Sequence, residues 1–480
     1  MTFLKKHNRI DIVILFVIII FALAFRLYKI ETPLIEFHSW RQADTLAVAR
    51  NYSREGINML LPRYDDVSPL QTGQDNPRGY RMVEFPLYNA VIALWYQLIP
   101  QLDIVVWGRA VSIFSSIVIL GIIFNLALRE AGRIAAVVSA MMYAVMPFFV
   151  FYTRAILPEV FASMLVMIAL YVAYRSRSKY AIILSAVAFA LAVLVKPTTV
   201  FYALALWYAY AHHQSKLSFR LATPLVLLAV ALVPFGLWRL YIQQYPEGIP
   251  ANSWLITSVS TGGAMYPIFF RPAFFRWIFF ERINVLILGS YNLVFFIQGL
   301  WSKTKTFLPH ALLLSSFAYL FTFQGGNVQH EYYQILILPS LAIISGIGFS
   351  YIYKNAHHLI QKIAVFAMGT ALFIASWFIS WEKVQHYYYS LSDIPQFAKI
   401  VRTFVAPDEL IVVDTGGDTT ALFAFDRKGS PGIYSSAKSF KEKGYAYIFT
   451  YNQQTADSLE QEDPTITRVF ANDRFVLLKL

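Results

Sequence analysis

Residues 110–128 read AVSIFSSIVILGIIFNLAL, an apolar run in which no side chain is charged. A run of this length is long enough for an α-helix to cross the hydrocarbon core of a bilayer. The full chain of 480 residues is 57% hydrophobic and only 14% charged. A soluble protein of this length needs more charge to cover its surface. The sequence therefore predicts a polytopic α-helical membrane protein.

Basic clusters between the apolar runs predict the topology, because Lys and Arg accumulate in the cytoplasmic loops of membrane proteins. The clusters are Lys5, Lys6 and Arg9; Arg129 and Arg133; Arg175, Arg177 and Lys179; Lys216 and Arg220; Lys303 and Lys305; and Lys354 and Lys362. Placing every cluster inside predicts about eleven transmembrane helices, with a cytoplasmic N-terminus and a C-terminus outside. The predicted spans are residues 10–29, 104–128, 134–151, 160–174, 180–195, 199–212, 221–243, 283–300, 306–323, 334–353 and 361–381.

Two apolar runs need a separate interpretation. Residues 86–100 are short for a span, and counting them would place the later basic clusters outside. We expect a helix in the outer membrane interface there, where Trp95 and Tyr96 are favourable residues. The first run contains Ala22-Leu23-Ala24, which resembles a signal-peptidase site, but we expect the run to remain as the first span.

The composition changes near residue 383, where apolar runs shorten to the length of strands. Strand-like and helix-like stretches then alternate, which predicts a small α/β domain over residues 383–480 on the outer face. Residues 1–382 form the predicted membrane domain, with a large outer loop over residues 30–103. The predicted strands are residues 410–414, 445–451 and 474–480.

Charge and cysteine content narrow the possible functions. The net charge is +12, and we attribute most of it to cytoplasmic loops rather than to a nucleic-acid partner. A minority of the basic residues can serve an anionic ligand such as a lipid phosphate. The chain has no cysteine, which excludes disulfides, thiolate metal sites and a cysteine nucleophile.

The most polar segment near the first span is HSWRQADTLAVARNY, residues 38–52. Ser39 and Gln42 have the spacing of a capping box, so we predict a helix from about Trp40 to Glu55. Arg41, Asp44 and Asn51 then share one face of that helix. A solvated amphipathic helix with an Arg41–Asp44 ion pair is the structural alternative to a functional site.

Several motifs resemble those of a known family. WRQADT, ARNY and EFPLY follow the first span in that order, and RAILPE, KPT and HEYYQILILP occur later in the chain. Together they resemble bacterial members of the family 39 glycosyltransferases, of the GT-C class, which includes protein O-mannosyltransferases and aminoarabinose transferases. The resemblance covers about residues 10–380. It implies a GT-C-like fold and transfer of a sugar from a polyprenyl-phosphate donor to a lipid, glycan or protein acceptor at the periplasmic face of the bacterial inner membrane.

The same resemblance implies the site residues. Asp44 is the best match to the essential acid, and Glu84 and Glu159 are further catalytic candidates. This chain has Arg41-Gln42 near the position of an Asp-Glu pair in relatives, and Glu84-Phe85-Pro86-Leu87 where they have Lys or His before Pro-Pro-Leu. The candidates for binding the lipid phosphate and the sugar are His38, Arg41, Gln42, Arg50, Arg154, Lys196, Arg282, His330 and Tyr333.

Structural roles remain open for several of these residues. Lys196 and Arg282 can be snorkelling anchors at the ends of spans. Glu159 can pair with Arg154 or stabilise the start of a helix, and Tyr333 can belong to an interfacial aromatic belt. A phosphate leaving group requires positive charge close to it, but the sequence does not say which basic residues converge.

No cofactor is certain from the sequence. The carboxylates of Asp44, Glu84, Glu159 and Asp65-Asp66 leave a divalent cation possible, but none has metal-ligand spacing. The turn at residues 414–418, DTGGD, is expected to be structural. A lipid transporter or flippase is the main alternative function, and it would show repeated halves and mid-membrane charges. An oligosaccharide polymerase or ligase is a second alternative, and a non-catalytic scaffold is a third.

Overall fold

The computed structural model describes residues 9–176, 178–212, 217–250, 271–389 and 393–480, and only the backbone of residues 217–224. Lys5, Lys6, Arg177 and Lys216, which contribute to the predicted topology, lie outside these ranges. The chain forms two compact units, which are described separately. The helical unit comprises Met1–Ile30, Arg109–Leu237 and Asn252–Tyr388, and the mixed unit comprises Glu31–Gly108, Trp238–Ala251 and Tyr389–Leu480.

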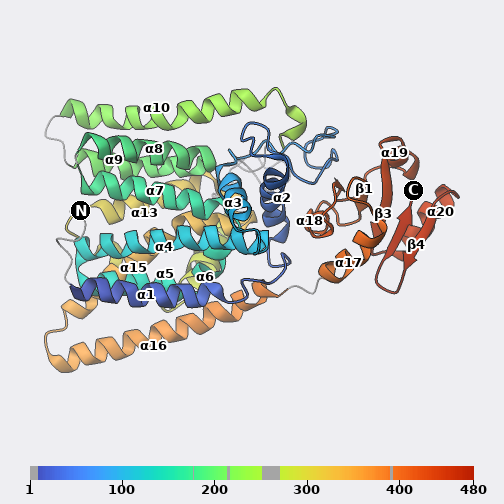
Figure 1. Cartoon of the computed structure of the whole chain (residues 1–480). Coiled ribbons are helices and arrows are strands. Elements are labelled where there is room, and N and C mark those ends of the chain that lie inside the picture. The colour runs from blue at the N-terminus through green and yellow to red at the C-terminus, as the bar shows by residue number, and fades with distance from the viewer. Residues whose placement is uncertain (1–8, 177, 213–216, 251–270, 390–392) are drawn as a thin grey trace. The chain divides into compact units, whose positions relative to one another are not determined.

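The helical unit is a bundle of long helices that run roughly alongside one another (Figure 1). Its α-helices are α1 (Arg9–Leu27), α4 (Ile104–Ala131), α5 (Arg133–Val145), α6 (Pro147–Arg154), α7 (Pro158–Arg175), α8 (Lys179–Val195), α9 (Ala203–Ala211), α10 (Leu217–Ile242), α11 (Pro272–Phe275), α12 (Leu293–Trp301), α13 (Leu308–Thr322), α14 (Gln324–Gln329), α15 (Leu338–Lys354) and α16 (Leu359–Val384). Short 3₁₀ or π segments are η1 (Pro197–Tyr202), η4 (Arg276–Ile287), η5 (Glu331–Ile337) and η6 (Gln385–Tyr388). Helices α4 and α10 extend a few residues into the mixed unit.

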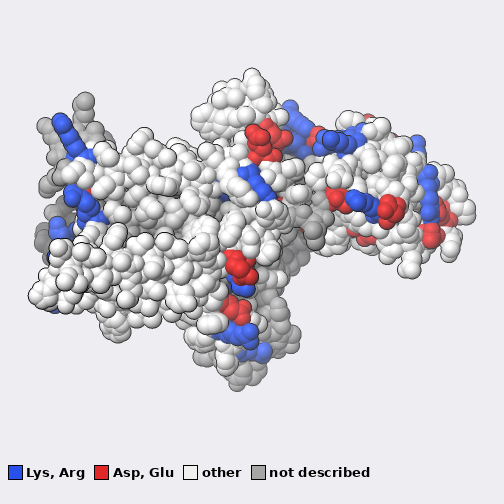
Figure 2. Space-filling view, turned by 90° about the horizontal axis from the view of Figure 1, so that it is seen from below, with Lys and Arg blue, Asp and Glu red and all other residues white. Residues whose placement is uncertain are grey.

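The surface of the helical unit suits a membrane. On the face shown in Figure 2, a broad band of described residues is free of charged side chains, and Lys and Arg gather at one end. In the described part of the chain, six helices are long and apolar enough to cross a bilayer, and a seventh span results if the bent pair α5–α6 counts as one. Helices α8 and α13 are shorter apolar helices. Each predicted span contains helical structure, but length and composition do not by themselves establish eleven spans.

The predicted span over residues 283–300 is wrong as a single helix. The structure has η4 and α12 there, separated by Gly289 and Ser290, which both have a positive φ. A side chain at position 289 would overlap the backbone carbonyl of Ser376 in α16. The break therefore comes from close packing against a helix far along the chain, which an apolar run does not reveal.

Contacts at the helix ends fix the directions of the first helices. Asp11 at the start of α1 lies 2.5 Å from Arg133 at the start of α5, so α1 and α5 run in the same direction. Helix α4 precedes α5 directly and runs the opposite way. At the other end, the Arg109 guanidinium donates to the Ile30 carbonyl at 2.6 Å. Residues 31–108 thus leave and rejoin the bundle at the same end.

Arg26 completes the hydrogen bonding where α5 breaks. Pro147 has no backbone N–H and ends the ladder of α5, leaving carbonyls without helical donors. The buried Arg26 guanidinium donates to Ala144 O at 2.7 Å, to Tyr143 O at 2.9 Å and to Thr153 Oγ1 at 3.0 Å. In an apolar environment such groups must be satisfied within the protein.

We therefore predict that Arg26→Leu destabilises the helical unit. Each buried carbonyl that loses its donor costs about 1–3 kcal/mol. The measurement is the thermal unfolding midpoint in detergent, followed by tryptophan fluorescence. Arg9→Gln is the control, because Arg9 is exposed on the same helix. An Arg26→Leu midpoint equal to that of the control would contradict this role.

The mixed unit contains a five-stranded sheet of order β2-β1-β3-β5-β4. The strands are β1 (Leu410–Val413), β2 (Gly429–Ser430), β3 (Tyr445–Thr450), β4 (Thr467–Ala471) and β5 (Val476–Lys479), and the helices around them are α17 (Ile394–Phe404), α18 (Thr420–Phe425), α19 (Ala437–Glu442) and α20 (Gln453–Glu462). Strand β1 pairs in parallel with β2 and β3, and β5 pairs antiparallel with β3 and β4. The three predicted strands are confirmed as β1, β3 and β5, and the prediction missed β2 and β4.

Both faces of this sheet are covered. Ile411 and Val413 pack with Phe397 on one face, while Val412 packs with Phe440 on the other. Strands buried on both faces have continuous apolar sequences, which explains the run LIVV in β1. Residues of the segment 31–108 extend the edge at β2, where Val67 N donates to Gly429 O at 2.9 Å.

The polar helix predicted near residue 40 is α2 (Ser39–Glu55), and it contacts α3 (Leu87–Leu98) in the mixed unit. The predicted capping box is wrong, because His38 is the N-cap residue in a left-handed conformation without a side-chain cap bond. The solvated alternative is also wrong, since all residues from Arg41 to Tyr52 are buried.

Helix α3 has 12 residues and is too short to cross a bilayer. A short 3₁₀ turn, η2 (Pro246–Gly248), contacts the same loop through Gly248 O and Met82 N at 2.8 Å.

Candidate active site

Asp44 is the more enclosed of the two predicted catalytic acids in the mixed unit, Asp44 and Glu84. It lies in the second turn of α2 and is 1% exposed. Its Oδ2 lies 2.7 Å from Nη2 of Arg81, and its Oδ1 accepts a hydrogen bond of 2.7 Å from the Thr419 hydroxyl. Asp44 is therefore held by one cation and one neutral donor, which come from two different segments of the chain.

Arg81 and Thr419 were not among the predicted site residues. Arg81 lies 5.1 Å above the ring of Tyr64 and donates to Gln71 Oε1 at 2.7 Å, which fixes its orientation towards Asp44. Its position three residues before Glu84, in the sequence RMVE, was the signal that could have found it. Thr419 directly follows the DTGGD turn, which was interpreted only as structural.

Arg41 and Glu84 form a second ion pair beside α2. Arg41 Nη2 lies 2.5 Å from Glu84 Oε1, and both side chains are largely shielded from solvent. The loop that carries Glu84 leads into α3, where the Asn89 amide donates to Thr45 O at 2.7 Å. The predicted residues Arg41, Asp44 and Glu84 thus lie in one unit, but Arg41 and Asp44 have different ionic partners.

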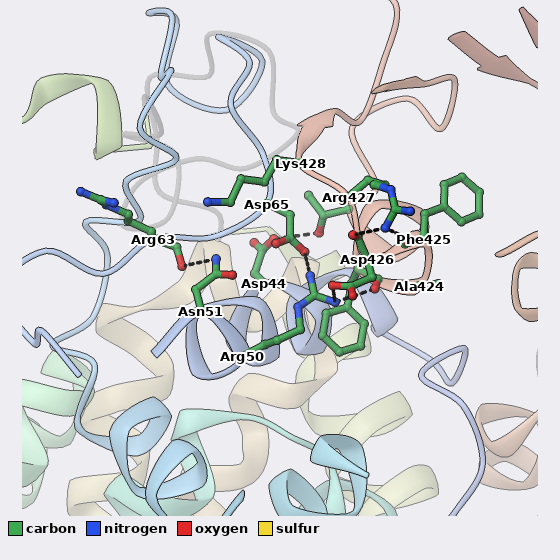
Figure 3. A network of polar contacts seen from close by, with 12 residues as sticks. Asp44, Arg50, Asn51, Arg63, Asp65, Ala424, Phe425, Asp426, Arg427 and Lys428 are labelled. Atoms are coloured by element: carbon green, nitrogen blue, oxygen red, sulfur yellow. Dashed lines mark hydrogen bonds and ion pairs between the residues drawn. The ribbon is translucent and has the colours of Figure 1, made fainter. Parts of the chain in front are cut away.

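Arg50 lies between Asp65 of the segment 31–108 and Asp426 of the C-terminal α/β segment (Figure 3). Its guanidinium contacts Asp65 at 2.5 Å and Asp426 at 2.9 Å, and it lies 4.6 Å above the Phe423 ring. Arg54 also pairs with Asp426, at 2.9 Å. These contacts use the guanidinium of Arg50 for cross-linking within the unit, which favours a structural role over phosphate binding.

His38 and Gln42 have local contacts at the start of α2. The His38 ring packs 4.1 Å from the Phe37 ring, and the Gln42 amide donates to Phe37 O at 3.3 Å. Gln42 is fully buried and His38 is half-buried. The described contacts place both residues near Arg41 but assign neither of them to a ligand.

Asp66, a buried acid next to Asp44, has a raised pKa. Burial raises the pKa of Asp66 to about 7, and the charge of Asp44 adds to this shift. Hydrogen bonds from Ser68 N at 2.8 Å and Ser68 Oγ at 2.6 Å oppose it, as does the charge of Arg81. Asp66 therefore titrates near neutral pH, close to the candidate base.

We predict that Asp66 makes stability fall as pH rises from about 4 to about 7. The pKa of Asp66 is higher in the folded state than in the unfolded state, so the native state binds more protons in this window. One such group changes the unfolding free energy by up to about 1.4 kcal/mol per pH unit. Asp66→Asn removes this contribution. Unfolding midpoints of wild type and variant at pH 5 and pH 7.5 test it, and an unchanged pH dependence in the variant would contradict it.

The helical unit holds a separate group of predicted residues at the ends of its helices. Glu159 starts α7 and is fully buried, and Lys196 follows α8. Lys196 Nζ lies 2.6 Å from Glu159 Oε1 and 5.0 Å from the centroid of the Tyr333 ring. The structure thus brings together three candidates from separate loops, and the ion pair of Glu159 is with Lys196.

Neighbouring residues extend this group. The His330 ring stacks on Tyr332 at 5.3 Å. Arg282 donates to the carbonyls of Asn327 and Val328, the second at 2.6 Å. Glu331 accepts hydrogen bonds from the hydroxyls of Tyr152 and Tyr387. The loop over residues 327–333 is therefore held by one cation and by two phenols.

Arg154 lies in the same unit but contacts other groups. Its guanidinium donates to Lys29 O at 3.0 Å and lies 5.1 Å above the Tyr388 ring. Both contacts connect α6 to the segments that flank the first and last long helices. In the described residues, no group of three or more His, Asp or Glu side chains has the arrangement of a metal site.

We predict that Lys196→Met destabilises the protein by about 3–5 kcal/mol, because it leaves Glu159 charged, buried and without its cation. The double variant Glu159→Gln/Lys196→Met should recover most of that loss. Thermal unfolding in nanodiscs measures both changes. Arg276→Gln is the control, since the Arg276–Glu281 pair is exposed and such pairs contribute little. Equal destabilisation in single and double variants would contradict the coupling.

Comparisons with known proteins support a common fold. The family profile described as dolichyl-phosphate-mannose-protein mannosyltransferase matches residues 80–238. A search of curated proteins finds no match. Among solved structures, apo ArnT from Cupriavidus metallidurans matches with a TM-score of 0.66 and 14% identity over 97% of each chain. The same protein bound to undecaprenyl phosphate matches with a TM-score of 0.63 and 13% identity, over 98% of this chain and 97% of that one.

Two larger glycosyltransferases are also similar. The Archaeoglobus fulgidus oligosaccharyltransferase in complex with Zn and sulfate has a TM-score of 0.57 and 11% identity, over 91% of this chain and 67% of that one. The arabinofuranosyltransferase AftD from Mycobacteria has a TM-score of 0.59 and 14% identity, over 98% of this chain and 40% of that one. The chain therefore resembles the GT-C glycosyltransferases and shares their multi-pass membrane fold.

Proposed function

We propose that this chain is an integral membrane glycosyltransferase that moves a sugar from a polyprenyl-phosphate donor to an envelope lipid, glycan or protein. The likeness to ArnT over nearly the whole length of both chains is the main support. The buried carboxylate of Asp44, which follows the first span in the chain, supplies the base that this chemistry requires.

Asp44 is the proposed catalytic base. It takes the proton of the acceptor hydroxyl while the acceptor oxygen forms a bond to the anomeric carbon. The bond between that carbon and the phosphate oxygen breaks, and polyprenyl phosphate leaves with the electron pair. Glu84 has its charge matched by Arg41 at 2.5 Å, so we assign it to sugar binding or to positioning Arg41.

Within the helical unit, Lys196 is the first candidate to bind a lipid phosphate. An ammonium is a compact charge that can exchange one anionic partner for another, and Lys196 now pairs with Glu159 beside Tyr333. Arg282 is a second candidate, although its guanidinium now donates to two backbone carbonyls. His330 and Tyr333 belong to the same surroundings. A divalent cation is not required by this assignment.

We also propose the predicted topology, with the N-terminus in the cytoplasm and the C-terminal segment on the periplasmic face of the bacterial inner membrane. Basic side chains gather at one end of the bundle (Figure 2). The contacts of Glu130 support one shared end for the basic clusters. Thr306 N donates to Glu130 at 2.7 Å, and the Tyr174 hydroxyl donates to it at 2.5 Å. The Arg109–Ile30 contact supports an outer loop that does not cross the membrane.

We predict that Asp44→Asn abolishes donor turnover, because an amide cannot accept the proton. The purified protein in nanodiscs is incubated with short-chain polyprenyl-phosphate monosaccharides, and released polyprenyl phosphate is measured. General-base removal lowers rates roughly 10²–10⁴-fold. Asp75→Asn is the matched control, since Asp75 is an exposed acid of the same unit that pairs with Lys443 at 2.7 Å.

The outcomes separate the functions. Release by wild type and by Asp75→Asn, but not by Asp44→Asn, supports the proposal. Equal release by the wild type and both variants would show that Asp44 is not the catalytic base, and Glu84 and Glu159 would become the next candidates. A donor panel that includes lipid-linked oligosaccharides separates this enzyme from a polymerase or ligase. Bound lipid without any release would overturn the enzyme assignment in favour of a transporter or flippase.

A further inference from the structure

The turn DTGGDTT, residues 414–420, follows strand β1 in a fixed shape. Gly416 and Gly417 have φ values of 62° and 101°, which only glycine adopts without strain. Gly417 N donates to Pro431 O at 2.8 Å, and the Thr415 hydroxyl donates to the Asp418 carbonyl at 2.7 Å. Asp418 Oδ1 then accepts from Thr420 N at 2.8 Å, at the start of α18.

This turn presents two hydroxyls to the first turns of α2. Thr419 Oγ1 donates to Asp44 Oδ1 at 2.7 Å and lies 3.2 Å from Trp40 O. Thr420 Oγ1 donates to Ser39 Oγ at 3.0 Å. Thr419 is 3% exposed, so water does not compete for its hydroxyl. All these residues belong to the mixed unit, and Thr419 and Asp44 are 375 residues apart in the chain.

We propose that Thr419 is a positioning residue for Asp44, so that the C-terminal α/β segment completes the catalytic site of the transferase. The inference rests on the proposed function and adds a residue to its site. A hydroxyl that donates to one carboxylate oxygen fixes the rotamer of the acid and stabilises its ionised form. The turn contributes this donor from a rigid backbone, as a precise site requires.

The geometry also distinguishes the two oxygens of Asp44. Oδ1 accepts from Thr419, whereas Oδ2 faces Arg81 at 2.7 Å but accepts no hydrogen bond within the described part of the chain. Oδ1 is therefore held by a hydroxyl and Oδ2 by a cation. The charge of Asp44 contributes to the raised pKa values of its titratable neighbours Asp66 and Tyr64, and Arg81 lies against both Asp44 and Tyr64.

The test compares Thr419→Val, Thr419→Ser and Thr420→Val in nanodiscs, using release of polyprenyl phosphate. Thr419→Val keeps the shape but removes the hydroxyl, so kcat should fall about ten- to hundredfold. The donor KM should stay near the wild-type value. The acidic limb of the pH–rate profile should move to higher pH, because the ionised carboxylate loses a donor. Thr419→Ser should restore both, and Thr420→Val should behave as wild type.

A Thr419→Val enzyme with wild-type kcat and pH profile would overturn the inference. So would an equal loss in Thr420→Val, which would indicate a general packing defect. Absence of release by wild type is a different result, because it removes the proposed function itself.

A cross-link tests the placement of the turn without relying on activity. The chain has no cysteine, so a disulfide in Ser39→Cys/Thr420→Cys reports only this contact. The two oxygens lie 3.0 Å apart, and we expect the disulfide to form under mild oxidation. Ser39→Cys/Ser436→Cys is the control pair, with the second cysteine at the start of α19. Failure of the first pair to cross-link, or equal cross-linking of both, would overturn the placement.

Discussion

Water is excluded from most of helix α2, so each charged side chain on it needs a partner within the protein. Arg41, Asp44 and Arg50 find partners of opposite charge at 2.5–2.7 Å. Those partners come from the segment 31–108, and for Arg50 also from Asp426 near the sheet. Because an unpaired buried charge is strongly destabilising, the segments that supply the partners are fixed around α2. The geometry at Asp44 depends on this matching.

The predictable part of the fold is the part that local sequence determines. Apolar runs located helices in all eleven predicted spans, and short apolar runs located β1, β3 and β5. The predictions that failed depend on contacts with residues that are far away in the chain. The break at Gly289 depends on packing against Ser376, and the expected cap at Ser39 is replaced by a contact with Thr420. Strand β2 has two residues, which is too short to show any pattern.

The sequence predicted which residues belong to the candidate site, but not which of them pair with one another. The helical spacing and the family resemblance singled out Asp44, and separate loops suggested Glu159, Lys196 and Tyr333. The sequence RMVE gave a signal for Arg81 but not for its pairing with Asp44, and Thr419 carried no signal, because only the folded chain brings both residues to Asp44. The lesson is physical: burial makes charge matching obligatory, but the sequence does not say which distant charge provides it.

The separation of Asp44 from Thr419 along the chain affects how the protein is made. A ribosome produces α2 and its neighbours Asp65 and Arg81 early, so two of the ion pairs can form while translation continues. Thr419 and Asp426 emerge only after every membrane helix has been synthesised. Until then, Asp44 and Arg50 are incompletely paired. A prematurely terminated chain would thus leave Asp44 without its hydroxyl donor and Arg50 with one of its two acidic partners, which marks it as immature for proteases that remove unfinished products.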